Sequence, residues 1–95
     1  MNQIKIVCTN IKVILDETPE TASWSYGTCS ESHDGSTRKS YEKTCCLAAG
    51  SHILTCRSFS GLGWKHGHIQ IGDEMFCNDF EFGYSLDQLV EFPGN

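Results

Sequence analysis

The sequence lacks long apolar segments, an excess of basic residues and clear helix signals. Its apolar runs, such as Val13-Ile14-Leu15, are only a few residues long, far short of the roughly 20 that a membrane-spanning helix needs. Seven Lys and Arg stand against 12 Asp and Glu, a net charge of −5. This charge does not suit the phosphates of nucleic acid or an anionic membrane surface. We therefore expect no nucleic-acid partner and no membrane span.

Common catalytic and cofactor motifs are also missing. No Gly-x-Ser-x-Gly elbow occurs. Gly61-x-Gly63-x-x-His66 has a histidine where the dinucleotide fingerprint requires its third glycine, so we interpret this stretch as a turn. Because nothing argues positively for catalysis, we expect a protein that is not an enzyme.

Cysteine, in contrast, is abundant. The chain contains Cys8, Cys29, Cys45, Cys46, Cys56 and Cys77. An even number in a short chain predicts disulfides and an oxidising compartment, and the absence of a C-x-x-C pair disfavours a zinc site. Adjacent cysteines on a strand point to opposite faces, so Cys45 and Cys46 should bond to different partners. We expect Cys56 to pair with Cys77, since they flank one candidate hairpin, and we leave the other pairings open.

The apolar pattern in the first half of the chain has a period of two, as in strands. It changes phase between residues 4–8 and 11–15, which predicts two strands meeting near Thr9 or one strand with a bulge. Residues 22–26 form the next strand, and residues 41–47 and 53–56 should pair as a hairpin. The polar residues between 28 and 40 predict a long surface loop.

The second half continues the pattern. Residues 69–71 alternate, and residues 75–82 place Phe76, Phe80 and Phe82 on one face of a strand. For the tail, residues 86–92, we favour a strand over a short helix. The sequence thus predicts an all-β, disulfide-linked antiparallel β-sandwich or small barrel, with about seven or eight short strands in one extracellular domain over residues 1–95.

The succession Cys45-Cys46, Gly63-Trp64-x-x-Gly67 and Cys77 resembles a group of small secreted, cysteine-rich β-modules with a CUB-like shape. The resemblance implies a β-sandwich of jelly-roll or CUB-like type that serves as an extracellular binding or structural module. In that group the turn before the tryptophan is closer to Asp-x-x-Gly-Asp-Gly-Trp, whereas this chain has Ser58 and Leu62 at the two aspartate positions. If those aspartates bind calcium in the relatives, this copy has lost that site.

His66 and His68 are two residues apart, so on a strand both rings would face the same way and could bind one transition metal. With Glu74 the stretch comes close to a cupin metal motif, which gives a small cupin-like metal-dependent enzyme as our second alternative function. The third histidine of that motif does not follow, so His52 or His33 would have to supply it. We favour two histidines on the exposed side of a strand.

The last third of the chain is acidic. Its candidate calcium ligands are Asp73, Glu74, Asn78, Asp79 and Glu81. The spacing of an EF-hand loop is absent, and Asp79 and Glu81 would share a strand face opposite the phenylalanines. We therefore favour solvated acids and no cofactor, with calcium as the alternative.

Trp64 lies in a glycine-rich turn where a large ring is hard to bury. We expect it to be exposed and to form a ligand-binding patch with His66 and His68. Trp64→Ala should then weaken binding and leave the fold intact. The function predicted is a secreted, non-enzymatic extracellular module that binds a protein, glycan or matrix ligand; the first alternative is a secreted defence or venom protein.

Overall fold

The computed structural model describes residues 5–15, 21–34, 40–64 and 66–92, and within these ranges it contains eight strands and no helix. The strands are β1 (Ile6–Ile14), β2 (Thr21–Tyr26), β3 (Cys29–Asp34), β4 (Ser40–Ala48), β5 (Gly50–Ser58), β6 (His68–Ile71), β7 (Glu74–Phe76) and β8 (Ser85–Phe92). None of the described segments has the helical length and apolarity needed to cross a bilayer.

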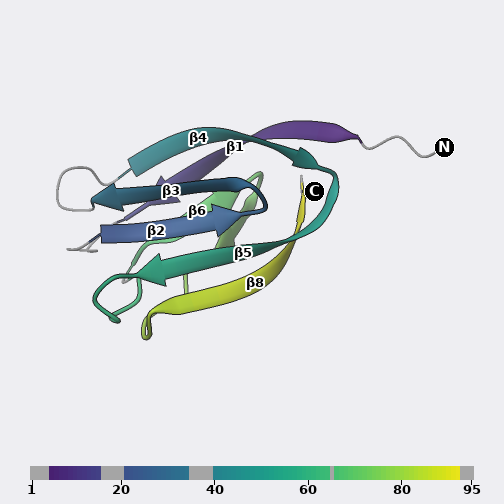
Figure 1. Ribbon diagram of the computed structural model, residues 1–95. Helices are drawn as coiled ribbons and strands as arrows, with labels where there is room; N and C mark the ends of the chain where they lie inside the picture. Colours follow the sequence, from purple (N-terminus) through teal and green to yellow (C-terminus); the bar gives the residue numbers. More distant parts are fainter. Residues whose placement is uncertain (1–4, 16–20, 35–39, 65, 93–95) are drawn as a thin grey trace.

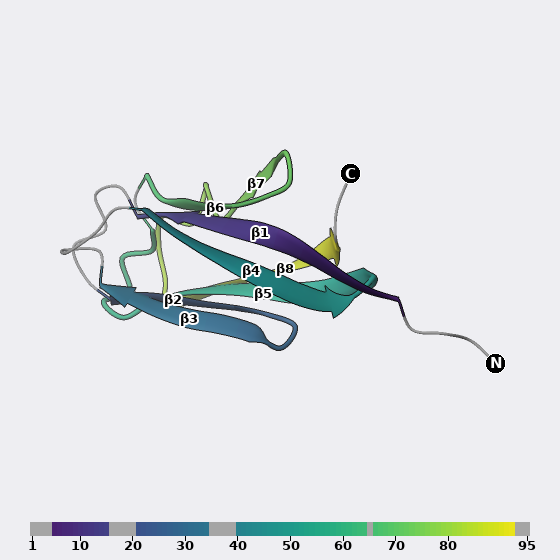
Figure 2. The same cartoon turned by 90° about the horizontal axis from the view of Figure 1, so that it is seen from above.

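The strands form two four-stranded antiparallel sheets that pack face to face (Figure 1). Sheet A has the order β4-β1-β6-β7, and sheet B has the order β3-β2-β5-β8. Seen from above, the two layers are separate, with β1, β6 and β7 in one and β2, β3 and β5 in the other (Figure 2). The predicted all-β, antiparallel β-sandwich is therefore confirmed.

The core lies between the sheets, because alternate residues of each strand point inward. Sheet A contributes mainly aliphatic side chains, such as Ile11 and Ile69, each with no exposed surface. Sheet B contributes large aromatic ones, including Trp24 and Tyr26. The hydroxyl of Tyr26 on β2 donates to the carbonyl of Val90 on β8 at 2.8 Å. Burial, and secondarily Glu91, raises the pKa of Tyr26 to about 12, so this donor keeps its proton.

Strand β1 has no break near Thr9, contrary to the sequence-based expectation. It pairs with β4 in one continuous register from Ile6 to Ile14, with neither a second strand nor a bulge. The change of phase in the apolar pattern arises because only the second half of the strand, Ile11–Ile14, also pairs with β6. In the first half an apolar residue can face solvent, as Ile6 does at 60% exposure. Cys8 faces outward as well, because it bonds to a strand neighbour and not into the core.

Two further expectations in the first half of the chain were wrong. The first half of the polar loop predicted over 28–40 is β3, which pairs with β2 through a two-residue turn at Gly27 and Thr28, while residues 35–39 lie outside the described residues. Gly27 has φ = 60°, as the first central residue of a type II′ hairpin turn does. In addition, β4 and β5 do not form a hairpin: β4 pairs with β1 and β5 with β2 and β8, so the short turn between them crosses from one sheet to the other.

The predicted strand over 75–82 ends at Phe76. Cys77 adopts φ = 61°, which turns the chain away from the sheet, and its N–H donates to Oε1 of Gln88 on β8 at 3.2 Å. As a result Phe80 is buried while Phe82 is 84% exposed, so the expected shared face does not exist. The tail, in contrast, forms the expected strand β8.

Three disulfides connect the strands. Cys8–Cys46 joins directly opposite residues of β1 and β4 within sheet A. The other two, Cys29–Cys45 and Cys56–Cys77, join sheet B to sheet A. The predicted Cys56–Cys77 pair and the separate partners of Cys45 and Cys46 are both confirmed. Three disulfides in a domain of this size are typical of extracellular proteins.

We predict that removing the buried Cys56–Cys77 disulfide lowers the stability of the fold more than removing the exposed Cys8–Cys46 disulfide does. Chain entropy alone favours the opposite order, because Cys8 and Cys46 are 38 residues apart and Cys56 and Cys77 only 21. However, Cys56 and Cys77 have no exposed surface, so alanine at both leaves a cavity between the sheets. C56A/C77A should lower the free energy of unfolding by about 1–2 kcal/mol more than C8A/C46A in urea titrations. A larger loss in C8A/C46A would show that loop entropy dominates.

Candidate binding site

Trp64 is fully buried, contrary to the expectation that it is exposed. Its indole N–H donates to the carbonyl of Arg57 at 2.8 Å, and its backbone N–H donates to the carbonyl of Phe80 at 2.7 Å. The ring therefore closes one end of the core. Trp64→Ala would remove core packing, so the expected loss of binding with an intact fold does not follow from this structure.

The glycines beside Trp64 explain how so large a ring is buried in a turn. A Cβ on Gly63 would lie 2.5 Å from the carbonyl oxygen of Phe80, so only glycine allows this approach of two backbones. Three residues before Trp64 in the first segment and three after Phe80 in the second, the N–H of Gly83 donates to the carbonyl of Gly61 at 2.9 Å. The segments 59–64 and 80–84 are thereby joined into one end of the molecule.

We predict that Gly63→Ala is much more destabilising than Gly50→Ala. Both glycines have positive φ, 73° and 134°, so both variants incur backbone strain. A Cβ on Gly50 meets nothing within 4 Å, whereas one on Gly63 meets backbone atoms that cannot move independently. The free energy of unfolding should fall by about 2 kcal/mol more in Gly63→Ala, as measured by urea denaturation. Equal losses would contradict the close backbone contact.

A hollow of about 520 Å³ lies beside this end of the molecule, on the outer face of sheet B. It is lined by Ser23, Ser32, Arg57, Ser58, Phe59 and Tyr84. Strand register accounts for its floor, since Ser32 on β3, Ser23 on β2 and Arg57 on β5 are successive partners across the sheet. Phe59 directly follows β5 and Tyr84 directly precedes β8, which places two aromatic rings at the end of this row.

Both rings are largely in solvent. Phe59 is 81% exposed and Tyr84 69% exposed, although large aromatic side chains in small domains are usually packed. The backbone carbonyl of Tyr84 accepts the N–H of Ser58 at 2.9 Å. A Cβ on Gly61 would lie 2.7 Å from the Tyr84 ring, so that ring rests on the bare Cα of Gly61. The hollow thus combines exposed aromatic faces, hydroxyl groups and one guanidinium.

The predicted histidine pair does not share a strand. His68 is the first residue of β6, but His66 lies in the preceding turn with φ = 60°. The rule that residues two apart on a strand face the same way therefore does not apply to this pair. The structure places neither histidine in the lining of the hollow.

The five candidate calcium ligands lie in two places along the chain, one before and one after Cys77. Asp73 lies in the turn between β6 and β7, Glu74 begins β7, and Asn78, Asp79 and Glu81 lie in the segment after Cys77. Within the described ranges, no three His, Cys, Asp or Glu side chains come close enough together to hold a metal ion. The structure therefore gives no support to the calcium or the cupin-like hypothesis in this part of the chain.

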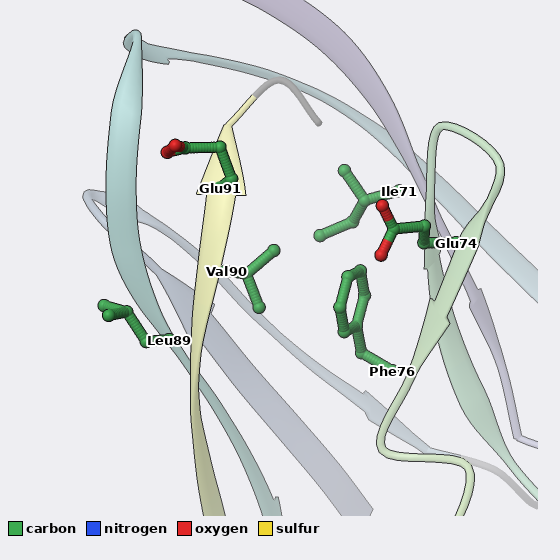
Figure 3. Close-up of a pocket in the computed structure, with 6 residues that line it drawn as sticks. All are labelled: Ile71, Glu74, Phe76, Leu89, Val90 and Glu91. Atoms are coloured by element: carbon green, nitrogen blue, oxygen red, sulfur yellow. The ribbon is translucent and has the colours of Figure 1, made fainter. Parts of the chain in front are cut away.

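A second, smaller hollow of about 110 Å³ lies between the edges of the two sheets, where β7 faces β8 (Figure 3). Val90 points across the gap towards Ile71 and Phe76, while Leu89 points away from it (Figure 3). Glu74 and Glu91 complete the lining. This hollow has a volume of about 110 Å³ against about 520 Å³ for the larger one, so it offers a ligand less room.

The inner face of β3 carries a polar cluster that sequence analysis missed. Nε2 of His33 accepts a hydrogen bond from the indole N–H of Trp24 at 3.1 Å and lies 3.4 Å from Glu31 Oε1. The imidazole stacks on Tyr41 with 3.9 Å between ring centroids, and Glu31 Oε2 lies 3.8 Å from Lys43 Nζ. Burial lowers the pKa of His33 from its ordinary 6.5, although Glu31 opposes this effect. The neutral ring is the form that accepts from Trp24.

We predict that His33 makes the protein less stable in mild acid. Because its pKa is lower folded than unfolded, the unfolded chain binds the proton more readily, and stability is lost as the pH falls below about 6.5. In urea titrations between neutral pH and mildly acidic pH, His33→Gln should flatten this dependence. His68→Gln, which removes a histidine from the other sheet, is the control. Identical pH profiles for His33→Gln and the unaltered chain would contradict the prediction.

Sequence analysis also missed the larger hollow, because its residues come from three strands that are separated along the chain. The polar run 28–40 had concealed β3, and with it the partnership of Ser32 and Ser23. Comparisons of the chain with protein-family models, with curated proteins and with solved structures found no match.

Proposed function

We propose that the protein is a secreted, non-enzymatic module that binds saccharides in the hollow formed by Ser23, Ser32, Arg57, Phe59 and Tyr84. The observation that carries the proposal is the high exposure of Phe59 and Tyr84, 81% and 69%, beside a row of hydroxyl groups. Two large rings left in solvent lose the free energy of burial, roughly 2 kcal/mol each, unless a ligand covers them.

Saccharides suit this combination of groups. A sugar ring has an apolar face of C–H groups that packs on an aromatic ring, and a rim of hydroxyls that needs hydrogen-bond partners. Here the aromatic rings stand at one end of the hollow and serine hydroxyls line its floor. A rigid framework also favours binding, since the segments that hold both rings are fixed by the Gly61–Gly83 hydrogen bond.

Two considerations support a role outside the cell. Three disulfides in a small domain are typical of extracellular proteins, and glycans are abundant extracellular ligands. The alternative of a secreted defence or venom protein shares this location and stays a prediction.

We predict that the protein binds a subset of a printed array of extracellular glycans, and that Phe59→Ala and Tyr84→Ala each weaken this binding about tenfold. The reason is the loss of one stacking surface, worth about 1–1.5 kcal/mol. Affinities for the arrayed glycan that binds best would be measured by titration calorimetry.

Phe82→Ala is the matched control. Phe82 is as exposed as Phe59, at 84%, but does not line the hollow, so its removal tests for general stickiness. If no arrayed glycan binds, or if Phe82→Ala weakens binding as much as Phe59→Ala, the proposal is wrong. The second outcome would instead favour a protein ligand docked on the apolar end of the molecule.

A further inference from the structure

The hollow contains one charged side chain, that of Arg57, and no acidic residue lines the hollow beside it. Arg57 lies on β5 between Ser23 on β2 and Ser85 on β8, its direct partners in the sheet. Both neighbours are short and uncharged, so nothing beside the guanidinium in this row neutralises it. Within the described part of the chain, no carboxylate forms an ion pair with Arg57.

The protein carries a net charge of −5, and Arg57 is the one charged residue in the lining of the hollow. Carboxylates outnumber cations, yet the one cation in the hollow is left without one. The fold does not need the guanidinium: Arg57 contributes to the core through its backbone carbonyl, which accepts from the Trp64 indole at 2.8 Å. The side chain is exposed.

We infer that Arg57 selects saccharides with a single anionic group, a carboxylate or a sulfate. A guanidinium binds either group through two parallel N–H···O bonds. Serine hydroxyls on Ser23 and Ser32 are placed to bind the oxygens of the same sugar, while Phe59 and Tyr84 cover an apolar face. This inference rests on the proposed function and specifies its ligand.

The acidity of the whole protein limits the ligand further. A long polyanion would meet repulsion from the net negative charge of the protein and from Asp87, the partner of Thr55, which lies two residues before Arg57 on β5. A ligand with one acidic sugar gains the contact with Arg57 and avoids most of this repulsion. The hollow therefore favours one acidic sugar over a polyanionic chain.

The test compares lactose with sialyllactose and sulfolactose, which add a carboxylate-bearing sugar and a sulfate to the same disaccharide. We expect the unaltered protein to bind at least one of the anionic probes about tenfold more tightly than lactose, with the preference weakening as salt rises. Arg57→Gln should reduce the preference, the ratio of the affinity for the anionic probe to that for lactose, to less than about threefold, because the anionic probes lose more affinity than lactose does. Whichever anionic probe is preferred identifies the group.

Lys12→Gln is the matched control, because it makes the same change in net charge at an exposed position on sheet A. It should keep the preference. Thermal unfolding of Arg57→Gln would verify that the fold is intact. Equal affinity of the unaltered protein for all three probes would overturn the inference and leave the proposed function standing. If the protein binds none of the three probes and no arrayed glycan, both the proposed function and this inference are wrong. If Lys12→Gln reduces the preference for the anionic probe as much as Arg57→Gln does, the preference is a general charge effect and the inference is wrong.

Discussion

The Cys56–Cys77 disulfide is the constraint on which the rest of the structure depends. It ties the middle of sheet B to the end of β7 in sheet A, at sulfur atoms with no exposure to solvent. Cys77 reverses the chain with a left-handed conformation immediately after β7. The segment that follows then runs back against residues 59–64, where it meets Gly63, encloses Trp64 and ends at Tyr84. A single covalent link therefore organises both the closure of the core and the place of one aromatic ring of the candidate site.

The sequence was sufficient for the class of fold because that class depends on local patterns. Alternation of apolar residues identifies strands such as β2 and β6, and an even cysteine count identifies disulfides. Adjacent residues on a strand point to opposite faces, so Cys45 and Cys46 were correctly predicted to bond to different partners. Each of these rules uses composition or a short stretch of the chain and needs no knowledge of contacts between distant segments.

The errors arose where contacts between distant segments decide the outcome. Trp64 was expected in solvent because its turn is rich in glycine, yet those glycines permit the backbone approach that buries it. Strand β3 was missed because its inner face carries Glu31 and His33 in place of apolar residues, and His33 is acceptable inside only because Trp24 donates to it. The candidate site could not be found either, since strand register, and not sequence order, brings Ser32, Ser23 and Arg57 into line.

The contact between Tyr84 and Gly61 has a consequence for how such a site is inherited. Because any side chain at position 61 would occupy the space of the Tyr84 ring, a substitution there would displace the ring without altering a single residue that lines the hollow. Mutational drift at one glycine could thus abolish recognition while every lining residue stays the same. Among chains that share this architecture, an aromatic residue at position 84 is informative only in combination with glycine at position 61, so the two positions should vary together.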